Sequence, residues 1–291
     1  MPLPAPEFAY AAGVHVARTS IWCDVARARG VSFLSRADVA LGRSAAVAHL
    51  VATDRTVRMR RALGLPVGDP LVPRFGRPFA LGRTRVELLP AGGLPGGARL
   101  HVEQGGWRGL YAGAVLREPA RGAEPAQVRA CDELVIDAPQ AGGVVDPAAS
   151  IDAALAEGAV LVPADLLTLA LLAGRVAPHH LAAPRRWARA LGLSRTRDVA
   201  RDTPRRDDLR RVVAGMRAAD EPALALGAGA GVAALVELAA TCGARRVHVR
   251  LAGLGRDPMR VLGAHALDAA LRAHGVRVGL IGPAEQLSLF R

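Results

Sequence analysis

The alternation of apolar and polar positions divides the chain into two parts with different patterns. Up to about residue 125, short apolar or alternating runs are separated by glycine and proline. Short strands with turn signals between them are typical of sheets packed face to face. The predicted strands are 31–35, 84–89, 99–103 and 109–112. Segments 44–52 and 55–63 have a helical pattern, and we expect them to cover the outer faces of the sheets.

Beyond residue 125 the pattern becomes an alternation of strands and helices. Such an order predicts βαβ units around a parallel sheet. The predicted strands are 133–137, 159–162, 223–226, 246–251 and 277–281. The predicted helices are 151–157, 164–173, 232–242 and 257–274. The polar, arginine-rich segment 178–220 is predicted to be helical with loops.

The composition is that of a globular α/β protein. The 291 residues suffice for one large domain or two smaller ones, and 51% hydrophobic residues exclude a disordered chain. Longer apolar runs such as 151–176 are broken by charged residues, here Glu157, Asp165 and Arg175, so we expect no membrane span. The N-terminus lacks a basic region followed by an apolar core, which predicts a cytoplasmic location.

The chain is strongly basic, with a formal net charge of +12, and all of its basic residues other than histidine are arginine. Arginine in place of lysine is typical of a GC-rich genome, which accounts for part of the charge. The surplus still favours a polyanionic partner, nucleic acid first. Residues 185–211 hold ten Arg and four Asp. This segment predicts either a nucleic-acid interface or a solvated helix with internal ion pairs.

The candidate nucleic-acid contacts combine arginines that could follow a phosphate backbone with one aromatic ring that could stack on a base. They are Arg185, Arg186, Trp187, Arg189, Arg205 and Arg206.

Four stretches, 33–41, 89–93, 111–114 and 247–253, resemble the metal-site segments of metallo-β-lactamase-fold nucleases. The resemblance is to the DNA-exonuclease and RNA-processing branch that carries a β-CASP domain. It implies an α/β fold, a metallo-β-lactamase-like αββα sandwich with a smaller β-CASP-like α/β portion. The implied division is a core over 1–150 with returning strands at about 244–281, a β-CASP-like segment over 151–243, and a tail over 282–291.

The same resemblance implies that the two-zinc ligands are lost. In the family a strand ends in Ser-His-x-His-x-Asp-His, and here Ser35 of that motif stays. Tyr111 and Gly113 likewise stay in the stretch that resembles the family's Tyr-Thr-Gly-Asp. The positions that would hold ligands carry Arg36, Asp38, Ala40, Leu41, Gly93 and Ala114, with Leu251 or Ala252 at the last histidine. Arginine stays protonated and cannot ligate a metal, and alanine, leucine and glycine have no donor atom. We therefore assign no catalytic residue, metal or cofactor. Asp137 ends a predicted strand at a position where the family has an acidic residue. Its carboxylate would either contact a ligand or simply be exposed to solvent.

Histidines and cysteines do not rebuild a site elsewhere in the sequence. The adjacent pair His179 and His180 lacks a third partner nearby, and neighbours on a helix diverge. Cys23, Cys131 and Cys242 are odd in number and far apart, which argues against a disulfide framework or a zinc ribbon. We expect them to be small core residues or surface thiols.

The C-terminal residues Gln286, Leu287, Ser288, Leu289 and Phe290 match the pentapeptide with which bacterial polymerases and repair proteins dock on the DNA sliding clamp. An extended peptide would present the glutamine for hydrogen bonding and the three apolar side chains to a pocket. The alternative is that this apolar end folds back onto the core.

The glycine-rich segment 227–231 between a predicted strand and a predicted helix is similar to a dinucleotide-binding turn. The next strand ends in Arg250-Leu251 rather than in the acidic residue that would bind a ribose, and close packing explains the glycines equally well.

Taken together, the sequence predicts a catalytically degenerate, nuclease-like accessory of DNA repair or replication that docks on the clamp and contacts nucleic acid. One alternative is an active metal-dependent exonuclease or phosphoesterase with an atypical site that uses Asp38, Asp137 or the histidines. Another is a nucleotide-binding regulator.

Overall fold

A computed structural model gives the structure of the chain. It describes residues 7–11, 13–27, 29–39, 49–116, 119–137, 147–163, 165–198, 209–213, 223–225, 230–251 and 258–282.

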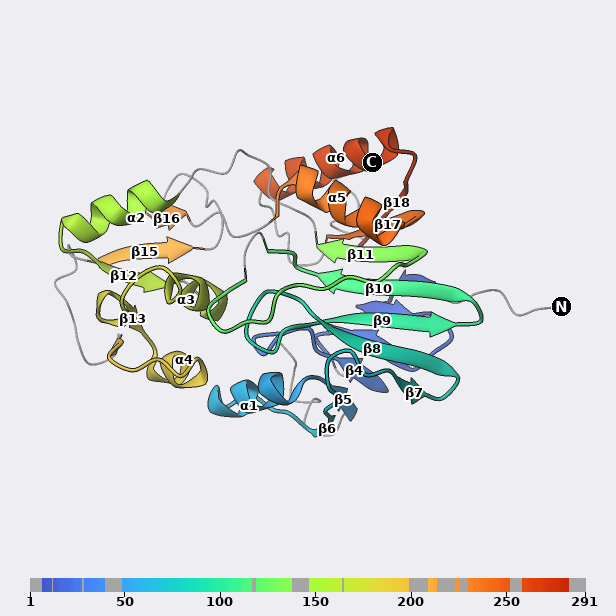
Figure 1. Cartoon of the computed structure of the whole chain (residues 1–291), viewed down its shortest axis with the longest axis horizontal. Helices are drawn as coiled ribbons and strands as arrows, with labels where there is room; N and C mark the ends of the chain where they lie inside the picture. The colour runs from blue at the N-terminus through green and yellow to red at the C-terminus, as the bar shows by residue number, and fades with distance from the viewer. Residues whose placement is uncertain are drawn as a thin grey trace.

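Two β-sheets form the larger part of the molecule (Figure 1). The first sheet has six strands in sequence order: β1 (Phe8–Tyr10), β2 (Val14–Val16), β3 (Ile21–Cys23), β4 (Val31–Phe33), β5 (His49–Val51) and β6 (Asp69–Leu71). The second has seven strands, in spatial order β18 (Arg277–Ile281), β17 (Arg246–Arg250), β11 (Glu133–Asp137), β10 (Trp107–Gly113), β9 (Ala98–Gln104), β8 (Thr84–Pro90) and β7 (Phe79–Leu81). Strands β7 to β10 are antiparallel, whereas β10, β11, β17 and β18 are parallel.

The sheets pack against each other through the apolar positions that alternate along their strands. Val135 of β11 lies in the core between the sheets, with Phe33 of β4 and Tyr111 of β10. Its neighbours Leu134 and Ile136 point the opposite way, into a second core. This period of two is what a β-strand with both faces buried requires.

Helices cover the outer face of each sheet. Helices α5 (Val232–Cys242) and α6 (Pro258–Ala273) pack on the seven-stranded sheet, where Leu235 and Leu267 join the second core. Helix α1 (Asp54–Ala62) places Val57 against Leu50 of the six-stranded sheet. The order of layers is therefore helix, sheet, sheet, helix, and the predicted αββα sandwich of an α/β protein is confirmed.

A smaller α/β unit lies beside one end of the sandwich (Figure 1). Its elements are α2 (Pro147–Ala156), β12 (Val160–Pro163), α3 (Leu166–Leu172), a 3₁₀ turn (Pro178–His180), β13 (Ala182–Ala183), α4 (Arg185–Ala190), β14 (Arg197–Asp198), β15 (Leu209–Val213) and β16 (Ala223–Ala225). The strands β12, β15 and β16 form a parallel sheet. The short strands β13 and β14 pair separately.

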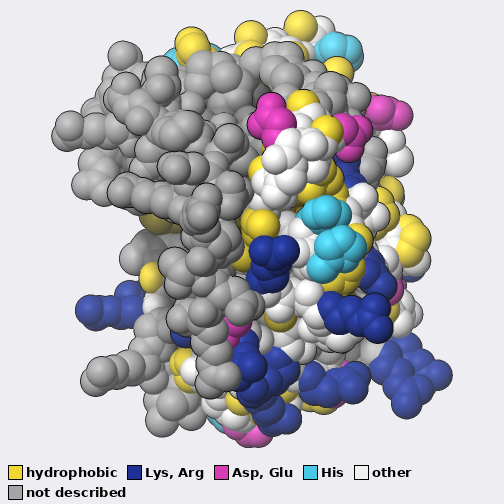
Figure 2. Space-filling model, turned by 90° about the vertical axis from the view of Figure 1, so that its left-hand side faces the viewer, with side chains coloured by type: hydrophobic (Ala, Val, Ile, Leu, Met, Phe, Trp, Pro, Cys, Tyr) yellow, Lys and Arg dark blue, Asp and Glu magenta, His cyan; other side chains and the backbone are white. Residues whose placement is uncertain are grey.

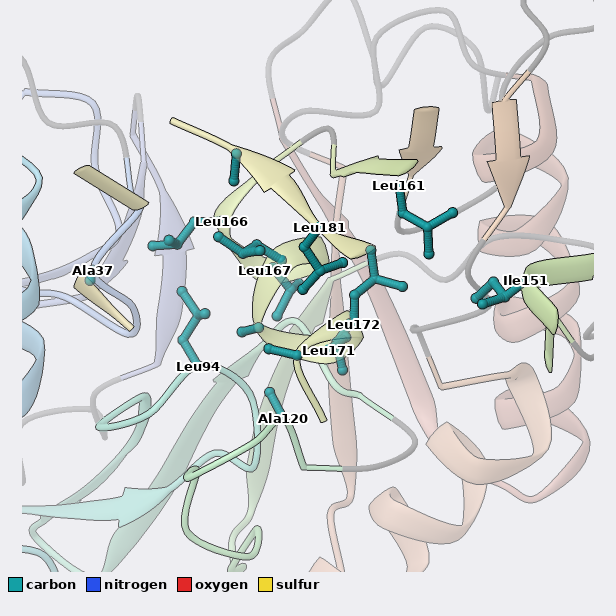
Figure 3. Close-up of a cluster of buried hydrophobic side chains, with 14 of the residues drawn as sticks. Ala37, Leu94, Ala120, Ile151, Leu161, Leu166, Leu167, Leu171, Leu172 and Leu181 are labelled. Carbon is teal, nitrogen blue, oxygen red and sulfur yellow. The ribbon is translucent and has the colours of Figure 1, made fainter. Parts of the chain in front are cut away.

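Helix α3 joins this unit to the sandwich. Its sequence, LLTLALL, is buried at every position. Leu166 and Leu167 belong to the same buried cluster as Ala37 and Leu94, which come from loops of the sandwich (Figure 3). A helix that is apolar all round needs partners on all sides, and the two units together supply them.

Three expectations from the sequence differ from the structure. Residues His49–Val51, expected to be helical within 44–52, form the parallel strand β5 between β4 and β6. Strand β15 lies in the segment expected to be helical, because it pairs between β12 and β16. Helix α5, which we placed in the β-CASP-like segment, packs on the seven-stranded sheet. In each case tertiary pairing or packing outweighs the local pattern.

Candidate functional site at the strand ends

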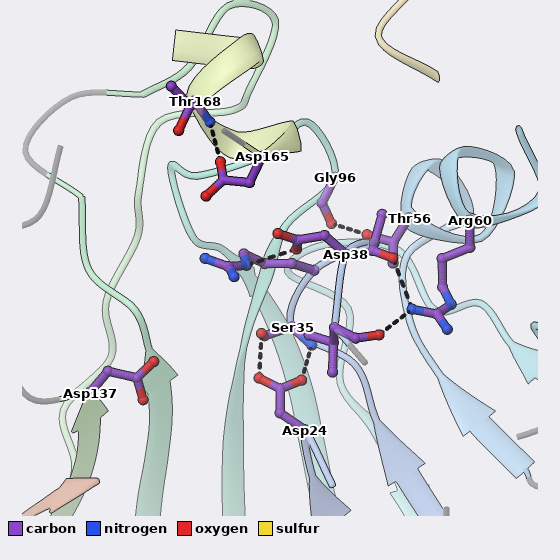
Figure 4. A network of polar contacts seen from close by, with 12 residues as sticks. Asp24, Ser35, Asp38, Thr56, Arg60, Gly96, Asp137, Asp165 and Thr168 are labelled. Carbon is purple, nitrogen blue, oxygen red and sulfur yellow. Dashed lines mark hydrogen bonds and ion pairs between the residues drawn. The ribbon is translucent and has the colours of Figure 1, made fainter. Parts of the chain in front are cut away.

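Charged side chains meet at the carboxyl ends of strands from both sheets. Asp24 follows β3, and Arg36 and Asp38 lie in the loop that follows β4. Asp137 and Arg250 are the last residues of β11 and β17. The carboxyl ends of parallel strands meet at one edge of a sheet, which is where ligands bind in many α/β folds. Figure 4 shows Asp24, Asp38 and Asp137 of this group.

Asp24 connects the two sheets. Its carboxylate accepts hydrogen bonds from the backbone N–H of Ser35 (2.8 Å), from the Ser35 hydroxyl and from the Tyr111 hydroxyl (2.9 Å). Burial raises the pKa of Tyr111 well above its ordinary value, so that its hydroxyl keeps the proton that it donates. Ser35 and Tyr111 are framework positions of the sequence resemblance, and both meet at Asp24, which no sequence motif had indicated.

The first ion pair of the site lies in the loop after β4. Nε of Arg36 donates to Oδ1 of Asp38 over 3.0 Å, and both side chains are half-buried. Burial alone would lower the pKa of Arg36, but the negative charges of Asp38, Asp24, Asp137 and Asp165 raise it above its ordinary value. Arg36 therefore stays a cation surrounded by carboxylates.

The second ion pair joins two neighbouring parallel strands. Arg250 donates from Nε to Oδ1 and from Nη2 to Oδ2 of Asp137, the latter over 2.8 Å. Its guanidinium also lies 5.5 Å from the centre of the Tyr111 ring. Burial would lower the pKa of Arg250, but the charge of Asp137 raises it well above the ordinary value. Asp137 is thus paired within the protein, and is not the simply solvated strand end considered from the sequence.

A buried arginine of α1 holds the loop that carries the first pair. Nη1 of Arg60 donates to the carbonyls of Ala37 (2.8 Å) and Val39 (2.7 Å), and its Nε donates to that of Pro66 (3.1 Å). Arg60 is fully buried. The amphipathic pattern of α1 did not indicate this role, because an arginine at a helical position is normally read as exposed.

The other positions that the resemblance associates with metal ligands provide no donor atoms. Gly93 is buried in the turn between β8 and β9, where Leu116 would contact an added Cβ at 3.8 Å. Ala114 is half-buried just after β10. Leu251 is buried in the core under α5 and α6. Ala40, Leu41 and Ala252 lie outside the described residues.

The donor set does not suit the zinc pair that the resemblance suggests. Arg36, Gly93 and Ala114 offer no ligand atom, and the carboxylates of Asp38 and Asp137 are engaged by guanidiniums. Within the described part of the chain, no group of three or more His, Cys, Asp or Glu could hold a metal ion. The rings of His179 and His180 lie 4.1 Å apart, in the second unit.

Exposed arginines gather on a second feature, a surface made by α1 and α4. Figure 2 shows basic side chains over the lower part of the face on which these two helices lie. We call this the α1–α4 basic surface. It consists of Arg55, Arg58, Arg61, Arg185, Arg186 and Arg189.

Only part of this surface was predicted from the sequence. Trp187 is half-buried and packs against the cluster around α3. Arg185 forms an ion pair of 3.1 Å with Asp198. Arg205 and Arg206 lie outside the described residues. The contribution of α1 was missed, because α1 and α4 are far apart in sequence and meet only in the fold.

Two other segments singled out in the sequence lie wholly or partly outside the described residues. Residues 227–229 and 283–291, which include Gln286 to Phe290, are not described. Gly231 begins α5, and the N–H of Ala230 donates to the carbonyl of Val115 over 2.9 Å. This contact ties the segment to the sandwich, as close packing would require.

Comparison with known proteins gives limited information. No protein-family model matches the chain, and no curated protein matches it. A solved structure of a protein of unknown function from Enterococcus faecalis V583 aligns with a TM-score of 0.38 and 11% identity, over 87% of this chain and 69% of that one. A metallo-β-lactamase with a HARLDQ motif from Cronobacter sakazakii (Enterobacter sakazakii) aligns with a TM-score of 0.24 and 18% identity, over 32% of this chain and 40% of that one.

The chain is thus weakly and partly similar to a metallo-β-lactamase. TM-scores this low support no inference about function, and the fold assignment depends on the sheet order and the covering helices. Among the helices of the described residues, none is long and apolar enough to cross a membrane.

Proposed function

We propose that the protein is a non-hydrolytic, nuclease-like accessory of DNA repair or replication that docks on the bacterial sliding clamp and contacts nucleic acid. One observation carries the non-hydrolytic part: the two strand-end carboxylates Asp38 and Asp137 are each bonded to an arginine of the same chain. A carboxylate paired with a guanidinium offers less net negative charge to a metal cation than an unpaired carboxylate does, and at least one of its lone pairs is already engaged. The arginines thus occupy the site as fixed internal cations.

The α1–α4 basic surface supports the nucleic-acid part of the proposal. Its arginines project from two packed helices, and phosphate contacts by arginine provide most of the sequence-independent affinity for DNA. Some of their charge is used internally, since Arg58 pairs with Asp54 and Arg185 with Asp198. Arg61, Arg186 and Arg189 are exposed as well, and they extend the surface along both helices.

The C-terminal pentapeptide supports the clamp part. It follows β18, an edge strand of the seven-stranded sheet that ends at Ile281. Gln286, Leu287, Leu289 and Phe290 supply the amide and the apolar side chains that peptide docking in a pocket needs.

Metal content and DNA cleavage test the non-hydrolytic part. Purified protein should contain no stoichiometric zinc or manganese, and it should leave single- and double-stranded DNA intact when either metal is added. An Arg36→His variant, which restores a possible ligand at one position, serves as a comparison. Stoichiometric metal together with metal-dependent DNA cleavage by the unaltered protein would overturn this part of the proposal.

Clamp docking is tested by measuring the affinity for the clamp of the same organism. Phe290→Ala should weaken binding at least tenfold, because it removes an aromatic anchor from the pocket. Ser288→Ala is the matched control, since serine or aspartate occurs at this position of the pentapeptide, and it should bind nearly as well as the unaltered chain. Equal affinity for all three proteins would remove the docking claim and leave the nucleic-acid part standing.

The basic surface is tested by the salt dependence of DNA binding. Combined replacement of Arg61, Arg186 and Arg189 by alanine should reduce the slope of log K against log salt by about 2 to 3 for double-stranded DNA. Replacing Arg74, Arg77 and Arg83, which are exposed near β7, removes the same charge elsewhere and should change the slope less. Equal effects of the two triple variants would show that net charge, not this surface, governs binding.

A further inference from the structure

Two cysteines that are distant in sequence meet in the core of the sandwich. Cys131 is separated from the start of β11 by Asp132, and Cys242 is the last residue of α5. The backbone N–H of Cys131 donates to the carbonyl of Cys242 over 2.9 Å. Both side chains are buried in the core that α5 and α6 form with the seven-stranded sheet, and both thiols are free.

The backbone geometry suits a disulfide. The 2.9 Å bond from the N–H of Cys131 to the carbonyl of Cys242 puts the two backbones in direct contact. Disulfides form without backbone movement when the Cα atoms are about 4.4 to 6.8 Å apart, which such a contact allows. Both side chains belong to the same buried cluster, and the two thiols lie within hydrogen-bonding contact of each other.

The two thiols differ in acidity because of their surroundings. The contact between them raises the pKa of Cys131 and lowers that of Cys242, and the nearby charge of Arg99 lowers the latter further. Arg99 is 2% exposed, and its Nη1 donates to the carbonyl of Gln127 over 3.0 Å. Its Nε is buried without a hydrogen-bond partner. A buried cation with an unsatisfied nitrogen favours a thiolate nearby, and the thiolate is the reactive form of cysteine.

We propose that Cys131 and Cys242 are a redox-active pair that low-molecular-weight disulfides convert into an intramolecular disulfide. The Cys242 thiolate attacks one sulfur of the small disulfide, which releases one small thiolate and leaves a mixed disulfide on Cys242. Cys131 then loses its proton, attacks the Cys242 sulfur and displaces the second small thiolate. The small disulfide is reduced to two thiols, and the protein loses two hydrogens.

The bond would connect the segment before β11 to the C-terminal end of α5. The whole smaller α/β unit, from α2 to β16, lies between the two cysteines in sequence. The disulfide would therefore close a loop that contains this unit, and it would restrict the unfolded chain over that length. It lies at the opposite end of β11 from Asp137, so that it leaves the candidate site unaltered.

The experiment refolds the full chain from denaturant in buffer with oxidised or reduced glutathione, which gives the oxidant access to both cysteines. Alkylation under denaturing conditions then counts the free thiols. Oxidised glutathione should reduce the count from the three cysteines of the chain to one, and peptide mapping should show Cys131 joined to Cys242. The oxidised protein should unfold at a temperature about 5 to 10 °C higher than the reduced protein.

Single variants make the result specific. Cys23→Ser should leave the disulfide in place, because Cys23 is buried in the other core, between the sheets. Cys131→Ser and Cys242→Ser should abolish both the disulfide and the temperature difference. When oxidised glutathione is instead added to the folded, reduced protein, Arg99→Met should slow oxidation several-fold without changing which cysteines pair. Three alkylated cysteines after refolding in oxidised glutathione, or a disulfide that includes Cys23, would overturn the proposal.

Discussion

Arg250 and Asp137 face each other across the parallel strands β17 and β11 and form a two-pronged ion pair. Each is the last residue of its strand, so that the pair closes the edge of the sheet at which the site lies. Paired guanidinium and carboxylate groups of this geometry are among the stronger polar contacts in proteins. The guanidinium also lies over the Tyr111 ring, which connects it to the Asp24 hydrogen bonds of the other sheet.

Replacement of one partner should destabilise the protein more than replacement of both. Arg250→Met would leave Asp137 as a partly buried carboxylate without its cation, and we expect a loss of about 3 kcal/mol in the free energy of unfolding. The double variant Arg250→Met/Asp137→Leu should regain at least half of that loss, since no unpaired charge is left. Urea denaturation of the unaltered chain, of the single variants Arg250→Met and Asp137→Leu, and of the double variant measures both effects. Additive losses would contradict a direct interaction.

The Tyr111 hydroxyl should stabilise the fold through its hydrogen bond to Asp24. Tyr111→Phe removes only the oxygen, and the loss of a hydrogen bond to a charged acceptor should cost about 2 kcal/mol. The effect should shrink in an Asp24→Asn background, where the acceptor is no longer charged. Chemical denaturation of this double-mutant cycle gives the interaction energy directly. An unchanged cost of Tyr111→Phe in that background would mean that ring packing, not the hydrogen bond, is affected.

The sequence predicted the fold best where charged residues or glycines lie at the ends of an apolar element. The ranges predicted for β11, α5 and β18 agree with the structure at both ends. The three-residue strand β5 was wrongly predicted, because so short a segment shows no periodicity that separates strand from helix. Its identity depends on pairing with β4 and β6, which local sequence does not contain.

The candidate site was predictable in its framework and not in its contacts. The resemblance pointed to Ser35, Arg36, Asp38 and Tyr111 as positions in the loops at the strand ends. It did not indicate that Ser35 and Tyr111 share Asp24, since Asp24 belongs to no motif and lies 87 positions from the tyrosine. The cysteine spacing likewise argued against a disulfide, yet the parallel sheet brings Cys131 and Cys242 together. Contacts between distant strands follow from topology, which the spacing of residues does not reveal.

Glu133 should make the stability of the protein depend on acid pH. Burial alone would raise the pKa of Glu133, but hydrogen bonds from His248 and from the backbone N–H of Phe8, with the charge of Arg246, lower it below its ordinary value of 4.5. A carboxylate with a lowered pKa stabilises the fold above that ordinary value. This contribution is lost as the pH falls through the lower pKa of the folded state.

The measurement is the free energy of unfolding between about pH 7 and about pH 3 for the unaltered chain and Glu133→Gln. The variant should be less stable at neutral pH, and its stability should fall less steeply below pH 4.5. Glu103→Gln, which replaces a partly exposed carboxylate of β9, is the control. Its free energy of unfolding should fall with pH as steeply as that of the unaltered chain. If the free energy of unfolding depends on pH in the same way for the unaltered chain and for Glu133→Gln, this carboxylate does not govern the loss of stability at acid pH.

Arg60 should be the residue that keeps the site loop in place. Arg60→Met retains much of the side-chain volume but leaves the carbonyls of Ala37, Val39 and Pro66 without their donor, and we expect a cost of about 3 kcal/mol. Arg61→Met, on the exposed side of the same helix, should change stability by less than about 0.5 kcal/mol. Hydrogen exchange adds a local readout, since the amides of Ala37 and Val39 should lose protection in the Arg60 variant before the rest of the sandwich does. Unchanged protection there, with or without a loss of global stability, would show that the loop is held by other contacts.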